Sequence, residues 1–386
     1  MSAIAAEAPL AILGGGPVGL TLALLLARRG VRSVVFDARS VEQASDDRRL
    51  LALSLGSLQT IGAVTDLPRG AVTPIRTVIV SSVGQFGRAV IGKSDVAGEM
   101  LGATIRYGEL IAALSAATAS NDLISMRRSV RVLAVQQFPA SVEIELDGHE
   151  PFGAPLALSA EGLGQAPVES ASQSALLADV EVSGIDAGTA CERFTRDGPL
   201  ALLPLPARLS AGSHRKALVW CMDPAQADRR SVLSDANFLA ELRSQLGGRG
   251  LQVLAVGARK CYPLYQRARD DLVEHRIVYL GNAAQTLHPV AGQGLNLGLR
   301  DSVILADQIG AACAAEADPV KALHEYARSR RADRAAILAL TRLTPSFFAT
   351  RFAPIAAVRS IGLTALAVVP NLRREFARLL MFGVRF

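Results

Sequence analysis

The sequence predicts an α/β fold, in which a parallel, Rossmann-like sheet is joined to a second, β-rich part and to a helical C-terminal tail. Two stretches, residues 10–37 and 277–305, each combine a short apolar run, a glycine-rich loop and a helical pattern. This is the pattern of strand–loop–helix units in a parallel sheet. Between them lie several short runs of strand type, and the last segment, 343–386, is apolar and aromatic.

The N-terminal unit carries a glycine-rich loop between its first strand and its first helix. A strand, a helix and a second strand are predicted within residues 10–37, and the second strand ends at Asp37. Between the first strand and the helix lie Gly14, Gly16 and Gly19, in the pattern G-x-G-x-x-G. Such glycines permit the tight turn, let a pyrophosphate touch the backbone, and let helix and strand pack closely.

Two further residues complete this nucleotide signature. Pro17 suits the first helical turn, where its missing N–H removes no hydrogen bond. Asp37 follows the loop at the distance where an acidic side chain accepts hydrogen bonds from both ribose hydroxyls. A tight turn in an ordinary βαβ unit is the alternative, but the full strand–loop–helix–strand–acid context favours a nucleotide site. The acid disfavours a 2′-phosphate, which leaves FAD or NAD as the nucleotide.

Arg49 has two interpretations of equal weight. It lies in residues 45–53, SDDRRLLAL, which carry two acids and two arginines just before a predicted apolar helix. The stretch is either a solvated helix start or the place from which Arg49 reaches a cofactor phosphate or a flavin edge. The second interpretation rests on arginine being the usual bidentate phosphate donor.

The middle of the chain is predicted as a second sheet with few helices. Strand patterns occupy residues 76–91, 130–146, 176–185, 216–221 and 251–263, and helical patterns occupy 101–117 and 236–246. A hairpin is expected near Pro139. Residues 150–174, rich in Gly, Pro, Ser and Ala, are expected to be the least structured part. Residues 200–206 contain two prolines and are expected at a sheet edge or in a loop.

The central stretch comprises residues 277–301, IVYLGNAAQTLHPVAGQGLNLGLRD. Its first four residues form a continuous apolar run, typical of a strand buried on both faces. A loop with three glycines follows, and a helix is predicted from Leu295. Glycines before a helix let backbone N–H groups approach a ligand, and the helix start adds positive potential. His288 in this loop is interpreted as a residue hydrogen-bonded to backbone rather than as a general base.

Composition narrows the function. The 386 residues carry a net charge of +6, spread along the chain without the aromatic–basic alternation of single-strand binders, so no nucleic-acid partner is expected. The four cysteines are far apart and the histidines show no metal-ligand spacing, so no metal site is predicted and a reducing, cytoplasmic compartment is favoured. Neither a signal peptide nor a bilayer-spanning run is recognised. No nucleophile triad emerges, as expected when a cofactor carries the chemistry.

The C-terminal segment, residues 343–386, has two interpretations. It is apolar, with six phenylalanines, and its six arginines are accompanied by one glutamate. It is either a set of helices packed on the body or on a dimer surface, or a peripheral contact with an anionic membrane.

Four stretches together carry a resemblance to a known family. They are AILGGGPVGLTLALLLARRG near the N-terminus, GPLALLPLP and LVWCMDP after CERFT, YLGNAAQTLHPVAGQGLNLGLRD, and RSIGLTAL followed by VPNLRREFARLL. They span nearly the whole length. The chain thereby resembles the FAD-dependent ubiquinone-biosynthesis hydroxylases, and most of all their 2-octaprenyl-6-methoxyphenol hydroxylase branch.

The resemblance implies an FAD site at matching positions. It assigns Gly14, Gly16, Gly19 and Asp37, with Pro17 beside them, to the ADP half of FAD, Arg49 to the flavin side, Gly281 and Asn282 to the ribityl chain or pyrophosphate, and Gly292, Gln293, Gly294 and Asn296 to the isoalloxazine ring. No side chain is assigned as catalytic, because the flavin would carry the reaction.

The resemblance also implies a monooxygenase reaction. NAD(P)H would reduce the FAD, O₂ would be captured as a flavin C4a-hydroperoxide, and a hydroxyl group would pass to the ring of a polyprenylated phenol in ubiquinone biosynthesis. The prenyl tail of such a substrate favours peripheral contact of the C-terminal segment with the inner face of the cell membrane. Other ubiquinone-biosynthesis proteins become expected partners.

The implied architecture is like that of p-hydroxybenzoate hydroxylase. The expected parts are a discontinuous FAD domain of residues 1–75, 101–175 and 264–342, a substrate domain of 76–100 and 176–263, and a C-terminal helical segment of 343–386. Residues 159–164, SAEGLG, depart from the family, which has Ala-Asp-Gly there, so Glu161 replaces the aspartate. The alternative function is therefore a catalytically impaired relative that serves as a structural partner in a ubiquinone-biosynthesis complex.

Overall fold

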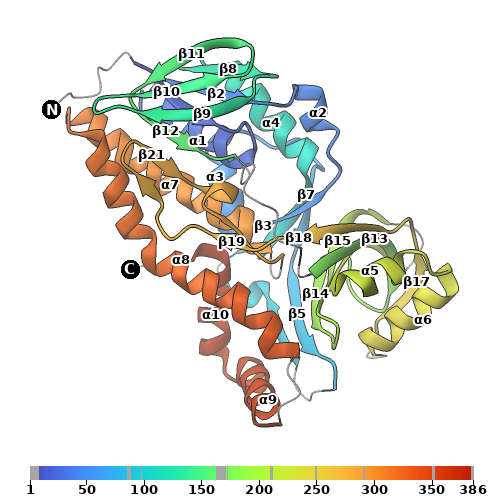
Figure 1. The fold of residues 1–386 in the computed structure, drawn as a ribbon. Coiled ribbons are helices and arrows are strands. Elements are labelled where there is room, and N and C mark those ends of the chain that lie inside the picture. The colour runs from blue at the N-terminus through green and yellow to red at the C-terminus, as the bar shows by residue number, and fades with distance from the viewer. Residues whose placement is uncertain are drawn as a thin grey trace.

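Two β-sheets lie side by side in the molecule, and a long helix connects the first of them to a C-terminal pair of helices (Figure 1). The computed structural model describes residues 8–84, 88–96, 98–161, 171, 173–208, 212–247, 250–289, 292–349 and 353–383. The N-terminal and central units share the first sheet, so the α/β class predicted from sequence is confirmed.

The first sheet has the strand order β20-β21-β12-β1-β2-β8. Its strands are β1 (Leu10–Leu13), β2 (Ser33–Asp37), β8 (Ile124–Arg128), β12 (Ala157–Ser159), β20 (Val273–Glu274) and β21 (Ile277–Tyr279). All neighbours pair in parallel except β20 and β21. The N-terminal strand and the central strand therefore end at the same edge of the sheet, separated only by β12.

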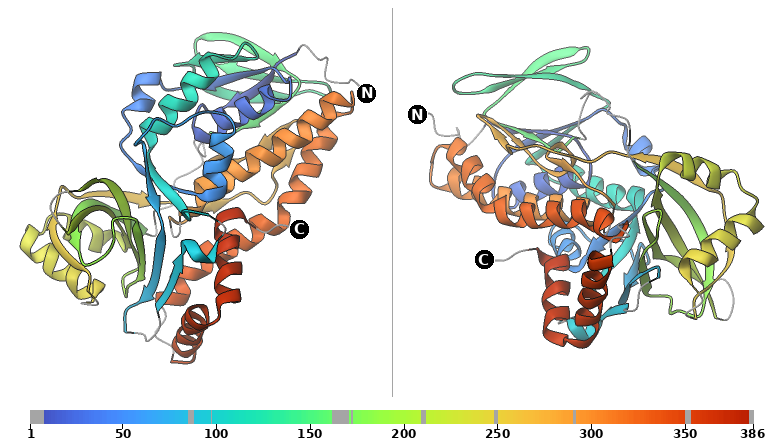
Figure 2. Two further views of the ribbon diagram at one scale, coloured as in Figure 1. Left: turned by 180° about the vertical axis from the view of Figure 1, so that it is seen from behind. Right: turned by 60° about the horizontal axis from the view of Figure 1, so that its bottom comes forward.

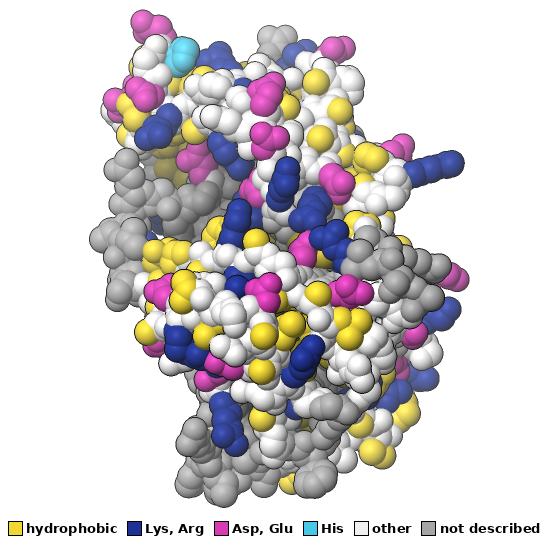
Figure 3. All heavy atoms as spheres, turned by 90° about the vertical axis from the view of Figure 1, so that its right-hand side faces the viewer, with side chains coloured by type: hydrophobic (Ala, Val, Ile, Leu, Met, Phe, Trp, Pro, Cys, Tyr) yellow, Lys and Arg dark blue, Asp and Glu magenta, His cyan; other side chains and the backbone are white. Residues whose placement is uncertain are grey.

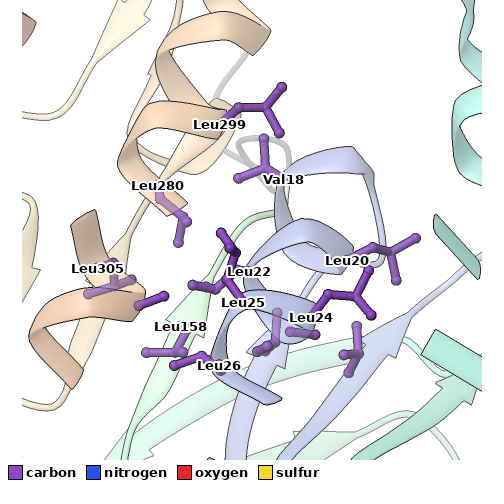
Figure 4. Packing of buried hydrophobic residues seen from close by; sticks show 14 of the residues in the cluster. Val18, Leu20, Leu22, Leu24, Leu25, Leu26, Leu158, Leu280, Leu299 and Leu305 are labelled. Carbon is purple, nitrogen blue, oxygen red and sulfur yellow. The ribbon is translucent and has the colours of Figure 1, made fainter. Parts of the chain in front are cut away.

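Both faces of this sheet are covered, which explains its unbroken apolar strands. Leu10 and Ile12 pack in one core cluster with α1 (Pro17–Ala27) and α7 (Gln293–Ala314). Ala11 and Leu13 point the other way, toward a three-stranded antiparallel sheet made of β9 (Val132–Gln137), β10 (Val142–Leu146) and β11 (His149–Ala154). Figure 4 shows the α1 side lying against the α7 side, with Val18 next to Leu299.

The second sheet has the order β17-β13-β16-β15-β14-β5-β6, with β18 also paired to β13. Its strands are β5 (Thr77–Ser82), β6 (Arg88–Gly92), β13 (Gln173–Ser183), β14 (Thr189–Phe194), β15 (Pro199–Arg208), β16 (Ser213–Met222), β17 (Gln252–Val256) and β18 (Lys260–Leu264). Helices α5 (Pro224–Ser231) and α6 (Asp235–Leu246) cover one face. Seen from this side of the molecule, basic and acidic side chains are interspersed (Figure 3).

Smaller elements connect the two sheets. The sheet β3-β7-β4 consists of β3 (Leu50–Ser54), β7 (Gly102–Arg106) and β4 (Val72–Ile75), and β19 (Arg267–Ala268) pairs with β22 (Gln285–Thr286). The remaining elements are α2 (Val41–Ser45), α3 (Leu55–Gly62), α4 (Tyr107–Ala119) and the 3₁₀ turns η1 (Lys93–Asp95) and η2 (Gly281–Ala283).

The C-terminal part is helical, as expected from sequence. Helix α8 (Pro319–Ala349) runs along the first body, and α9 (Ala353–Val368) and α10 (Pro370–Phe382) follow it. Figure 2 shows α9 and α10 beside the strands that connect the two sheets. Ala377 and Met381 of α10 pack with Ile91 of β6 and Leu101.

Four local predictions are corrected. Residues 102–106 are a strand and the helix begins only at Tyr107, whereas one helix was predicted from residue 101. The apolar residues after Arg49 form strand β3 rather than a helix. Strand β12 lies inside the segment expected to be least structured, of which residues 162–170 and 172 fall outside the described part. Strand β15 is interior, between β14 and β16, and Pro204 and Pro206 lie where its register with β16 shifts, so they remove few ladder hydrogen bonds.

Candidate functional site

The N-terminal loop has room only for glycine at two positions. Gly14 has φ +106°, and a Cβ there would lie 2.7 Å from the backbone nitrogen of Glu161. A Cβ on Gly19 would lie 2.0 Å from the carbonyl oxygen of Gly14, so helix α1 is packed directly on the loop. At Gly16 a Cβ would meet only the Tyr107 hydroxyl, at 3.5 Å. The backbone at Gly16 is therefore the part of the loop that a ligand can approach.

The start of α1 is suited to an anionic group. Gly16 is the N-cap and contributes no capping side chain, Pro17 occupies the first turn, and that turn contains no acidic residue. The N–H groups of a first helical turn have no intrahelical acceptor and carry partial positive charge. A pyrophosphate at this place would satisfy them, so the loop fits the nucleotide that its sequence predicts.

Asp37 lies next to this loop, at the end of β2. A Cβ on Gly15 would lie 2.8 Å from Asp37 Oδ2, which shows how closely the carboxylate and the loop approach. The carboxylate accepts a hydrogen bond from the Arg39 backbone N–H at 2.8 Å, and Arg128 Nη1 lies 3.5 Å from its other oxygen. Burial and the charge of Asp37 raise the pKa of Glu161. Glu161, which stands where the family has aspartate, therefore lies next to the predicted nucleotide site.

Arg49 lies at the entrance to β3 and is half exposed. Its guanidinium pairs with Asp47, with an Nη2–Oδ2 distance of 2.6 Å, and lies over the Tyr107 ring at 4.8 Å from the centroid. Arg39 donates a hydrogen bond to the Tyr107 hydroxyl at 3.0 Å. Arg49 precedes strand β3 and not a helix. Its neighbour Tyr107 also lies in front of Gly16.

Tyr107 is a residue that the sequence analysis missed. It begins α4, its ring is buried, and it contacts Arg39, Arg49 and the space in front of Gly16. The available signal was its place directly after a strand, but that strand was predicted as helix.

The central loop packs against the first turn of α1. Gly281 has φ +57°, and a Cβ there would lie 3.2 Å from Val18 Cγ2. A Cβ on Gly298, in α7, would lie 2.8 Å from the same methyl group. The Asn282 side chain is exposed. The two glycine-rich units, far apart in sequence, thus meet at Val18.

Two side chains, Asn296 and Gln293, fix the position of the start of α7. Gly292 is the N-cap, with φ +59° and no capping side chain, and a Cβ on Gly294 would meet nothing within 4 Å. Asn296 accepts a hydrogen bond from the Ser54 backbone N–H at 2.8 Å and donates to the Ala52 and Gly292 carbonyls at 3.0 and 2.6 Å. Its side chain therefore anchors the loop to β3, which leaves the backbone near Gly294 facing open space.

Gln293 anchors the same helix start to the C-terminus of the structure. Its Nε2 donates to the Leu380 carbonyl of α10 at 3.3 Å, and the Ser54 hydroxyl donates to the Met381 carbonyl at 3.0 Å. Helix α10 thus borders the site, which the sequence analysis did not foresee.

His288 is buried and neutral. Its Nε2 lies 2.7 Å from Oε1 of Gln173 at the start of β13, and burial lowers the pKa of the imidazole to about 4. This side-chain contact was not expected from sequence, where a hydrogen bond to backbone was predicted. The contact ties the central loop to the second sheet.

Comparison with known proteins agrees with this geometry. A family model described as the FAD binding domain matches residues 7–150 and 157–341. The ubiquinone hydroxylase UbiL of Rhodospirillum rubrum is 32% identical over 384 residues, which cover 95% of this chain and 88% of that protein. The 3-demethoxyubiquinol 3-hydroxylase of Escherichia coli is 28% identical over 386 residues, with coverage of 95% and 96%.

Solved structures show the same fold at low sequence identity. The p-nitrophenol 4-monooxygenase PnpA from Pseudomonas putida superimposes with a TM-score of 0.73 at 19% identity and covers 100% of both chains. PqsL, a probable FAD-dependent monooxygenase from Pseudomonas aeruginosa, gives 0.73 at 19% identity over 90% of this chain and 99% of that one. The chain therefore belongs to the FAD-binding-domain family of flavin-dependent monooxygenases, in the branch of the ubiquinone-biosynthesis hydroxylases.

Proposed function

We propose that this protein hydroxylates the aromatic ring of a polyprenylated phenol in ubiquinone biosynthesis, with bound FAD, NAD(P)H as reductant and O₂ as oxygen source. The observation that carries the proposal is the meeting of the two glycine-rich units at Val18, in a chain that matches a ubiquinone hydroxylase over 384 residues. FAD, when bound, would supply both the electron transfer and the activation of oxygen.

The residues of the site divide the binding of FAD between them. Gly14, Gly16, Pro17, Gly19 and Asp37 would hold the ADP half, and Arg49 would contact the flavin side. Gly281 and Asn282 would meet the ribityl chain or pyrophosphate, and Gly292, Gln293 and Gly294 would meet the ring, with Asn296 fixing their loop. The uncapped start of α7, a helix of 22 residues, would stabilise negative charge on the reduced ring. We assign FAD binding to residues 1–75, 101–175 and 264–342, and substrate binding to residues 76–100 and 176–263.

The test is reduction and turnover of the purified holoenzyme. We expect NAD(P)H to bleach the bound-flavin absorbance in the absence of O₂, and faster when a short-chain prenylphenol is present. In isotopically labelled O₂, the hydroxylated phenol should contain one labelled oxygen atom, because a monooxygenase inserts one atom of O₂. Flavin that binds but does not bleach would refute NAD(P)H as the reductant. A protein that binds no flavin at all would favour the structural-partner alternative.

We also propose that the α9–α10 turn contacts an anionic membrane. Val368 at the end of α9 is 71% exposed, and Val369 and Leu372 beside it are 45% and 47% exposed. Arg374 and Arg378 lie one and two turns further along α10, on exposed positions. Apolar side chains next to basic ones are the combination that binds an anionic lipid surface.

Among the described residues, no helix combines the length and the apolar character needed to cross a bilayer. We therefore expect peripheral binding: co-sedimentation with vesicles that contain anionic lipid, weaker with zwitterionic vesicles and weaker in high salt. The double variant Val368→Ser/Val369→Ser should bind these vesicles less. The matched control is Val232→Ser, because Val232 is 82% exposed but lies next to α5 in the other body. Equal binding by both variants would contradict the proposal.

A further inference from the structure

The two faces of the second sheet differ in what they contact. On one face, Cys191, Leu202 and Trp220 pack against Ala227 of α5 and Phe238 of α6. Because side chains alternate along a strand, the neighbouring residues point to the opposite face. The strand register then aligns one row across that face, Leu177, Val219, Ala201, Glu192 and Val80, each paired with the next.

This row is not fully sealed by packing. Its five side chains are neither fully buried nor exposed, although the sheet strands around them are largely buried. Four of the five are apolar, and Glu192 is the one carboxyl among them.

The row faces the body that is formed by the first sheet and the C-terminal helices, because contacts to that body lie on two sides of the row. Gln173, on the same face as Leu177, lies against His288 of the central loop. On the other side Val78, which shares the face of Val80, packs against the cluster that contains Met381 of α10.

A third contact closes the junction between the two bodies. The Thr104 hydroxyl of β7 donates to the Pro204 carbonyl of β15 at 2.7 Å. Thr104 pairs with Ala52, and Ala52 in turn lies beside the N-cap of α7. The face of the second sheet that carries Glu192 is therefore bordered by the central loop, by α10 and by the strands that carry the start of α7.

Glu192 lacks a protein partner within the described part of the chain: no hydrogen bond or ion pair reaches its carboxyl. Glu192 is partly buried and retains some accessible surface. Burial raises the pKa of Glu192 to about 8, so the carboxyl is mostly protonated at neutral pH and can both donate and accept a hydrogen bond. A largely buried polar group without a hydrogen-bond partner is unfavourable. A ligand that completes its hydrogen bonds would remove this cost.

We propose that the Glu192 carboxyl binds the phenol hydroxyl of the substrate and thereby orients the aromatic ring. A phenol hydroxyl both donates and accepts, which complements this carboxyl, while the apolar neighbours Val80, Ala201 and Val219 fit the ring. The inference rests on the proposed function, since that function supplies the phenol. It assigns a substrate-contacting side chain in a protein whose sequence showed none.

The experiment compares a phenol with its methyl ether. Oxidised holoenzyme is titrated with 2-prenylphenol and with 2-prenylanisole, and binding is followed by the change in flavin absorbance. The wild type should prefer the phenol, because the ether cannot donate a hydrogen bond. In Glu192→Leu this preference should fall by about tenfold, the effect of one hydrogen bond to a buried group. Glu192→Gln, whose amide also donates and accepts, should keep most of the preference.

The matched control is Glu181→Leu, on β13 three strands away in the same sheet, which should leave the ratio of affinities unchanged. If Glu192→Leu weakens both ligands equally, Glu192 does not contact the hydroxyl and the inference fails while the proposed function stands. If the wild type binds neither ligand, the proposed function fails and the inference falls with it.

Discussion

Replacing Gly19 by alanine is expected to abolish FAD binding and to lower the free energy of unfolding by about 1–3 kcal/mol, the cost of forcing an extra methyl group into a packed site. The added Cβ would lie 2.0 Å from the Gly14 carbonyl oxygen, a backbone atom that cannot move aside alone. Either α1 or the loop must shift, and both place the backbone at Gly16. The measurements are the ratio of flavin to protein absorbance after purification and the midpoint of denaturant unfolding.

The control for this variant is Gly62→Ala. Gly62 is the last residue of α3, and a Cβ there would meet nothing within 4 Å. It should therefore retain flavin and stability. A Gly19→Ala protein that is folded and holds a full complement of FAD would show that the close approach of α1 to the loop does not position the nucleotide.

Replacing Arg330 by leucine is expected to destabilise the protein by about 3–5 kcal/mol, because it leaves the buried Asp301 carboxylate without its salt bridge and leaves Asp333 with Arg300 alone. Arg330 of α8 donates to Asp301 Oδ1 of α7 at 2.7 Å and also pairs with Asp333. All three side chains are at most 3% exposed. Burial raises the pKa of Asp301 even with this partner present, so removing the arginine makes the charged form still less favourable. Guanidinium unfolding followed by circular dichroism measures the loss.

Arg328→Leu is the matched control, two residues away on the same helix. Its guanidinium is 71% exposed and pairs with Glu325 in solvent, so its loss should cost about 0–1 kcal/mol. The double variant Asp301→Asn/Arg330→Leu should recover part of the lost stability, since it removes the Asp301 charge that Arg330 no longer neutralises. An Arg330→Leu variant as stable as Arg328→Leu would contradict this account of the network.

The buried network also explains how α10 reaches the site. A Cβ on Gly383, directly after α10, would lie 2.5 Å from Asp333 Oδ1, so the end of this helix rests on the carboxylate that Arg330 binds. Within one turn of Gly383, the carbonyls of Leu380 and Met381 accept hydrogen bonds from Gln293 and Ser54. Loss of Arg330 is therefore expected to loosen the contact of α10 with the start of α7 as well.

Local sequence patterns predicted the structure correctly where the residues of one short stretch determine it. The strand, loop and helix around Gly14 and those around Gly292 were predicted correctly, because a fully apolar run, a group of glycines and a helical period lie within one short stretch. The hairpin near Pro139 was also confirmed, as β9 and β10.

Local sequence patterns gave wrong predictions where pairing with neighbouring strands determines the structure. Strand β12 has three residues, too few to show a period, and it is a strand because β1 and β21 lie on either side of it. Strand β7 resembles the helix that follows it, but it pairs with β3 and β4. The prolines of β15 indicated an edge, yet the register shift lets an interior strand accommodate them.

The sequence by itself determined the fold class, the family and the glycines that a nucleotide requires, since these depend on backbone conformation and on spacing along one stretch. Tertiary structure alone decided what surrounds the site: Tyr107 in front of Gly16, the hydrogen bonds of Asn296 to β3, the position of α10 and the partial exposure of Glu192. These features join residues more than eighty positions apart or depend on strand register. No local pattern encodes such contacts, because the free energy of each one arises only after the separate elements have packed.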